Sequence, residues 1–143
     1  MRNNELEPFG EVVDPRERAR LLDQGLDDLA RYWAGEFEPV PVQKPRIPVW
    51  VAAVWPHRRP VRRALRWDGV FPIGLPGPDA LAELVAEIGE SRPAGDPFDV
   101  VVEVEPEDDT GPWERAGATW AVTGFGRQPT RDRVRAAIDA GPR

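Results

Sequence analysis

Hydrophobic positions along this chain alternate between two kinds of spacing. Short, continuous apolar runs at residues 49–54 and 70–73 are typical of parallel strands, and the first run predicts a strand that is covered on both faces. After each run, apolar residues recur every three or four positions, which is the spacing of an amphipathic helix. The clearest such helix carries its apolar face on Leu81, Leu84, Val85 and Ile88. The pattern predicts an α/β fold in which strands and helices alternate.

Two further strands are predicted at residues 98–104 and 118–123. The first of them alternates, and one side carries Asp99, Val101 and Glu103 while the valines at even positions lie on the other. Residues 105–117 connect the two strands and contain Pro106, Gly111 and Pro112. Since proline and glycine oppose a full crossover helix, we expect only one helical turn near residues 113–116.

Capping residues mark the ends of the other helices. Asp14 precedes a proline, and this predicts a helix over residues 15–33 that ends before Gly35. A second proline begins a short helix over residues 60–67, and Thr130 caps the last helix. The predicted order is therefore one helix followed by four strand and helix pairs.

Length and composition narrow the classes of function. The chain has 143 residues, which predicts a single domain over residues 1–143 with an irregular lead over residues 1–13. It contains no cysteine and one histidine, which excludes thiolate metal sites and most catalytic triads. A net charge of -6 argues against binding to nucleic acid or to anionic lipid. No apolar run is long enough to cross a membrane, and we expect a cytoplasmic protein.

Several segments, in their order and spacing, resemble the C-terminal half of the luciferase-like flavin-dependent oxidoreductases and monooxygenases. The segments are Phe9-Gly10-Glu11, Asp14-Pro15-Arg16-Glu17-Arg18, Leu22-Asp23-Gln24-Gly25-Leu26, Pro45-Arg46-Ile47-Pro48-Val49-Trp50-Val51, Arg66-Trp67-Asp68-Gly69-Val70-Phe71-Pro72 and Ala116-Gly117-Ala118-Thr119-Trp120. The family consists of TIM (β/α)8 barrels, so the resemblance implies half of such a barrel, with about four parallel strands and covering helices. It also implies FMN or a deazaflavin as the cofactor.

The resemblance directs attention to the carboxyl ends of the strands, where barrel enzymes hold their active sites. At the end of the first strand, the candidate cofactor contacts are Ala52, Ala53, His57, Arg58 and Arg59. The loop that contains the last three leads into a helix N-terminus, which can attract phosphate. For His57 the alternatives are a solvated loop residue and a phosphate or substrate contact. Relatives usually carry a Gly-Gly pair where this chain has the two alanines.

Glu103 is the other candidate catalytic residue, together with His57. If its side of the third strand faces the barrel interior, its carboxylate lies at the active-site end; otherwise it is a surface glutamate or the partner of a salt bridge. Trp50 and Trp120 are interpreted as packing residues in preference to flavin-stacking residues. The acidic run from Glu105 to Asp109 lacks the spacing of a metal site, so no metal is expected.

Half of a barrel has two unpaired edge strands and an interior face open to water. We therefore expect this chain either to associate with itself or to pair with an N-terminal barrel half. Two functions remain open from the sequence. The first is a truncated flavin-dependent oxidoreductase or monooxygenase in which the flavin carries the redox chemistry. The second is a non-catalytic remnant that acts through homodimerisation or by completing a partner barrel half.

Overall fold

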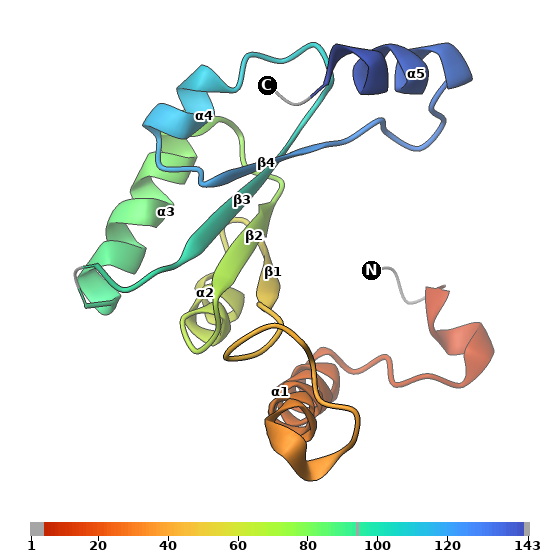
Figure 1. Cartoon of the computed structure of the whole chain (residues 1–143), viewed down its shortest axis with the longest axis vertical. Coiled ribbons are helices and arrows are strands. Elements are labelled where there is room, and N and C mark those ends of the chain that lie inside the picture. The colour runs from red at the N-terminus through yellow and green to blue at the C-terminus, as the bar shows by residue number, and fades with distance from the viewer. Residues whose placement is uncertain (1–4, 94, 142–143) are drawn as a thin grey trace. The chain divides into compact units, whose positions relative to one another are not determined.

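The structure, a computed structural model, describes residues 5–93 and 95–141 (Figure 1). The chain divides into two compact units, Met1–Ile47 and Pro48–Arg143, and each is described here by itself. The expectation of a single domain stays a prediction.

The first unit is built around one long helix. A 3₁₀ turn, η2 (Glu7–Phe9), lies in the lead, and α1 (Pro15–Arg31) follows it. As predicted, Asp14 caps α1, because its Oδ1 accepts hydrogen bonds from the backbone N–H groups of Arg16 and Glu17 at 3.0 and 2.8 Å. A segment with π-helical hydrogen bonding, η3 (Tyr32–Glu36), follows α1, and Gly35 within it has a φ of 115°, the left-handed conformation that was predicted to end the helix. No residue of α1 is buried, and its leucines lie exposed or half-exposed.

The second unit is a parallel sheet with helices between its strands (Figure 1). Its elements are β1 (Trp50–Val54), α2 (Arg58–Ala64), β2 (Gly69–Ile73), α3 (Pro78–Ser91), β3 (Asp99–Val104), α4 (Gly111–Arg115), β4 (Trp120–Thr123) and α5 (Arg131–Ala140). The four strands lie in chain order, β1-β2-β3-β4, and each neighbouring pair is parallel. The predicted α/β fold and its strands are confirmed.

Helix α2 shows where the predicted boundaries were wrong. It begins at Arg58 and ends at Ala64, whereas the sequence predicted residues 60–67. The first N–H groups of a helix have no partner within it, so Pro60 is tolerated inside the first turn and does not have to begin the helix. After the helix, Trp67 N–H bonds to the carbonyl of Ala64, as in a tighter turn.

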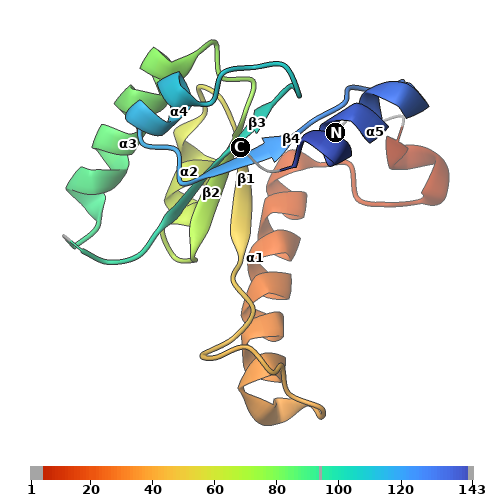
Figure 2. The same cartoon turned by 45° about the horizontal axis from the view of Figure 1, so that its top comes forward.

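One face of the sheet carries the core of this unit. Val51 of β1 pairs with Val70 of β2, which pairs with Val100 of β3, and all three are buried. Leu81 and Leu84 of α3 are buried as well. Figures 1 and 2 both show α2, α3 and α4 on the same side of the sheet. On β1, β2 and β3 the side chains of this covered face are thus largely removed from water, whereas every residue of β4 is exposed.

Within this unit the other face of the sheet is largely exposed, although Val101 of β3 is buried there. In β1 exposed and buried residues alternate, so the prediction of a strand covered on both faces was wrong. The reason is that the connecting helices lie on one side of the sheet, and a continuous apolar run does not reveal this. By alternation and pairing, this open face carries Trp50, Ala52, Val54, Phe71, Ile73, Asp99, Val101, Glu103, Trp120 and Val122.

Two tryptophans meet across the open face. The ring centroids of Trp50 and Trp120 are 5.5 Å apart, although β2 and β3 lie between their strands. Trp50 passes over Gly69 of β2, which has no side chain, since a Cβ there would lie 2.7 Å from Trp50 Cδ1. The two indoles therefore cover the amino end of this face.

Candidate functional site

A cavity of about 300 Å³ lies at the carboxyl ends of β2, β3 and β4. Apolar side chains of Phe71, Ile73 and Trp113 form part of its lining. Parallel α/β proteins hold their ligands at this end of the strands, because the loops that follow the strands meet there. This cavity is therefore the candidate functional site.

Glu103 of β3 lines this cavity and belongs to the open face. Gly124, just after β4, leaves the room that the carboxylate occupies, because a Cβ at this glycine would lie within 2.2 Å of Glu103 Oε1. Gly124 is itself held by a backbone hydrogen bond to Val104. Glu103 thus lies at the cavity and is also exposed, so both alternatives from the sequence, an active-site carboxylate and a surface glutamate, stay open.

The charge of the cavity is acidic. Glu105 and Asp108 line it together with Glu103, and no lysine, arginine or histidine is among its lining residues in the described part of the chain. Carboxylates repel a phosphate and attract cations or neutral hydrogen-bond donors. Across the described residues, however, no group of three or more acidic, histidine or cysteine side chains has an arrangement that could hold a metal ion.

The candidate residues at the end of β1 do not come together in one site. Ala52 lies exposed on the open face, whereas Ala53 lies on the covered face and is only 2% exposed. Neighbouring residues of a strand point to opposite faces, so the two alanines cannot line one cavity. His57 is exposed at the start of α2 and makes no side-chain capping hydrogen bond there.

Arg58 is held away from the carboxyl-end cavity by other partners. Its guanidinium donates to Glu87 of α3 at 2.6 Å and to the carbonyl of Pro56 at 3.1 Å, and it stacks on Trp55 at 4.4 Å. Arg59 is exposed. None of the five residues expected at the end of β1 lines the cavity, which is formed by the loops after β2, β3 and β4.

A polar cluster at the amino ends of the strands was not anticipated. Asp99 of β3 accepts a hydrogen bond from Trp50 Nε1 at 2.9 Å and another from Trp120 Nε1 at 3.0 Å. Gly69 of β2 makes room for this cluster, because a Cβ there would lie 2.6 Å from the Asp99 carbonyl oxygen and 2.7 Å from Trp50 Cδ1. The two tryptophans therefore pack on each other on the open face, and neither lines the carboxyl-end cavity.

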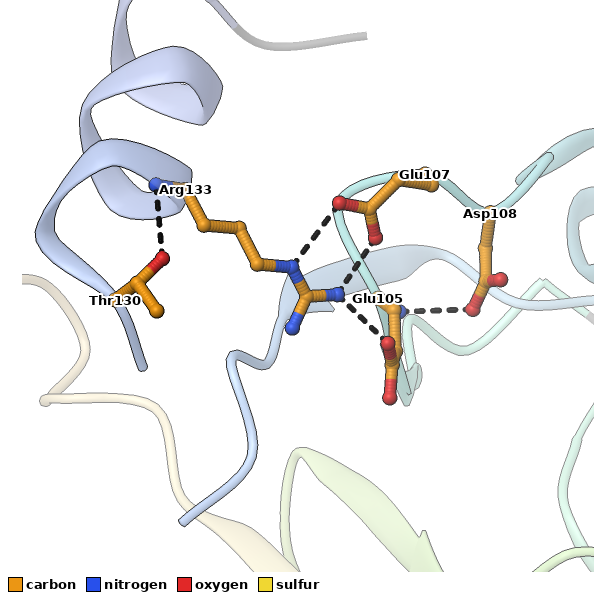
Figure 3. A network of polar contacts seen from close by, with 5 residues as sticks. All are labelled: Glu105, Glu107, Asp108, Thr130 and Arg133. Carbon is orange, nitrogen blue, oxygen red and sulfur yellow. Dashed lines mark hydrogen bonds and ion pairs between the residues drawn. The ribbon is translucent and has the colours of Figure 1, made fainter. Parts of the chain in front are cut away.

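A second polar network joins α5 to the loop after β3 (Figure 3). Arg133 donates to Glu107 at 2.6 and 3.0 Å and to Glu105 at 2.7 Å, and Asp108 accepts the backbone N–H of Glu105 at 2.8 Å. The two glutamates, Glu107 first, raise the pKa of the Arg133 guanidinium above its usual value. This network fixes two of the acidic residues that line the cavity.

Comparisons with known proteins do not identify a family. No family model, no curated protein and no solved structure matches this chain. No helix in the described part of the chain is long and apolar enough to cross a membrane.

Proposed function

We propose that this chain is the C-terminal half of a luciferase-like (β/α)8 barrel and takes part in flavin-dependent oxidoreductase or monooxygenase chemistry when the barrel is completed. One observation supports this most strongly: the four parallel strands lie in chain order, with the helices that connect them on one face. A barrel needs this arrangement, whereas a doubly wound sheet changes its strand order and carries helices on both faces.

The composition of the open face also supports half of a barrel. In complete barrels the interior is filled by layers of four side chains that come from alternate strands. Four consecutive strands would supply two side chains to each layer. The apolar side chains of the open face, such as Val54, Phe71 and Ile73, are of the kind that fills such an interior.

A complete flavin mononucleotide does not fit the cavity of this chain alone. The apolar surfaces of Phe71, Ile73 and Trp113 suit a planar ring, but the carboxylates of Glu103, Glu105 and Asp108 do not suit a phosphate. The flavin, when bound, supplies the redox chemistry. The contribution of this chain is then an apolar surface for the ring and the Glu103 carboxylate as an acceptor of hydrogen bonds.

The acidic cavity favours a second candidate function. A chain that lacks a phosphate site can still serve as a non-catalytic module that acts by association, as a homodimer or by completing a partner barrel half. In that function the open face, and not the cavity, is the functional surface.

Flavin titration distinguishes these two functions. We expect riboflavin, which lacks the phosphate, to give saturable fluorescence quenching with a Kd on the order of micromolar, and FMN or a deazaflavin phosphate to bind more weakly. Trp113→Ala should abolish the quenching, because Trp113 lines the cavity. Trp55→Ala is the matched control, since Trp55 stacks on Arg58 outside the cavity. Absence of saturable binding for all these flavins would contradict the flavin contacts proposed for the cavity of this chain and would favour the association module.

A further inference from the structure

The open face is too apolar to be left in water. Val101 is buried, but most of the other large side chains retain much of their accessible surface: 37% for Trp50, 51% for Val54, 48% for Ile73, 52% for Trp120 and 40% for Val122. Parallel sheets are normally covered on both faces, and a contiguous exposed apolar surface marks a site of association.

The two outer strands add unpaired backbone groups to this surface. In the described part of the chain, β1 pairs only with β2, and β4 pairs only with β3. The outward edges of β1 and β4 therefore have backbone N–H and C=O groups without a neighbouring strand. Such edges recruit another strand unless something protects them.

We propose that a second copy of this chain covers the open face, so that two four-stranded sheets close into one eight-stranded parallel barrel. In this dimer β4 of each copy pairs with β1 of the other. A two-fold axis along the barrel keeps all strands parallel and makes the two new strand pairs identical. The proposal uses the half-barrel arrangement described above and does not depend on flavin.

The number of strands favours a second copy over other occupants of the open face. Eight strands enclose an interior that side chains can just fill, and four strands supply half of each layer. Two copies therefore complete every layer and pair both edges at once. A helix laid over the open face would exclude water from it but would leave the edges of β1 and β4 unpaired.

The charges on the open face are compatible with closure. Asp99 lies on the face that becomes the interior of the proposed barrel. Both of its carboxylate oxygens already accept hydrogen bonds from indole N–H groups, those of Trp50 and Trp120. Glu103 lies at the carboxyl ends of the strands, where the barrel remains open to solvent. A buried carboxylate without a partner would make closure costly. Closure of this barrel buries none.

Cross-linking tests the proposed strand pairing directly. The chain has no cysteine, so introduced cysteines are unique. We mix Ala52→Cys, on the open face of β1, with Val122→Cys, on the open face of β4, and add a short bismaleimide. The mixed covalent dimer should dominate over either homodimer. Glu83→Cys, at an exposed position on α3, is the control and should give no covalent dimer with either variant.

A charge placed on the open face provides an independent test. Val122→Lys should shift the protein from dimer to monomer in light scattering and keep the helical signal in circular dichroism. Val42→Lys makes the same change at a valine that is 92% exposed outside the sheet, and it should remain dimeric. Two results would overturn the proposal: a monomeric wild-type protein, or a dimer in which Ala52→Cys and Val122→Cys do not cross-link to each other. Neither result bears on flavin binding to the cavity, which the flavin titration measures separately.

Discussion

The two faces of this sheet are built from the same strands, but they have different surroundings. On the covered face, Val51 and Ala53 of β1 are buried together with residues of α2 and α3. On the open face, Trp50 and Val54 of the same strand keep a third to a half of their surface exposed. Both sets of residues are apolar. The difference shows that this chain carries two apolar sheet faces but places its connecting helices over only one of them.

The largest expected effect lies in the core of the covered face. Leu84 of α3 is 1% exposed, and Leu84→Ala should lower the free energy of unfolding by about 2–5 kcal/mol, because it removes buried methyl groups and leaves a cavity. Leu22→Ala on α1 is the control, since Leu22 is 46% exposed, and it should cost less than about 1 kcal/mol. Urea denaturation measures both variants. Equal losses would mean that α3 does not form the core of the unit.

A smaller loss is expected at the glycine beneath the tryptophan cluster. Gly69→Ala would force a Cβ against the backbone carbonyl of Asp99 and should cost about 1–3 kcal/mol, since backbone atoms cannot move aside as a flexible side chain can. Gly89→Ala, inside α3, is the control. A Cβ there meets nothing within 4 Å, so this variant should gain up to about 1 kcal/mol from helix propensity. Thermal unfolding of the two variants should therefore shift in opposite directions.

The polar contact on the open face is expected to contribute less. Asp99→Asn keeps one acceptor oxygen but turns an amide N–H₂ group toward the second indole N–H, so one of the two hydrogen bonds is lost. The cost should be about 1–2 kcal/mol. Tryptophan fluorescence should change as well, because both indoles contact this side chain. Asp139→Asn, at an exposed position of α5, should change neither quantity.

The smallest effect is expected at α5, where no residue is buried. Arg133→Ala removes the ion pairs to Glu105 and Glu107. Amide hydrogen exchange should become faster in α5 and in the loop after β3, while β1 to β3 keep their protection. Because the neighbouring glutamates raise an already high pKa, Arg133 stays charged at every physiological pH and the pairs are not lost through its deprotonation. Arg135→Ala on the same helix is the control, and unchanged exchange in both variants would show that the network does not hold α5.

The order of the strands and helices could be predicted from the sequence, but which face of the sheet the helices cover could not. Apolar runs and caps such as Asp14 and Thr130 gave the strands and helices, with boundary errors such as those of α2. A continuous apolar strand has the same pattern whether a helix of the same chain or another chain covers it. The run at β1 therefore could not show that one face would be open.

The candidate site was predicted only in part, for a similar reason. Strand alternation assigns Glu103 to a face and to a strand end, and the structure places it there, but a catalytic role for its carboxylate stays a prediction. The cavity itself depends on how the loops after β2, β3 and β4 pack together. The spacing of apolar residues within each segment does not predict that packing. The pairing of Asp99 with two indoles joins residues that are 49 and 21 positions apart, and only the strand register brings them together. The one available signal was that Asp99 and Val101 lie on the same face of the predicted strand.

The most direct test is the molar mass of the wild-type protein in solution. Light scattering over a range of protein concentrations should give twice the 16.0 kDa of one chain, and the dimer should persist when flavin is absent. A mass of one chain at every concentration into the micromolar range would mean that the open face stays in water or is covered by its own chain, and the eight-stranded closure would be wrong.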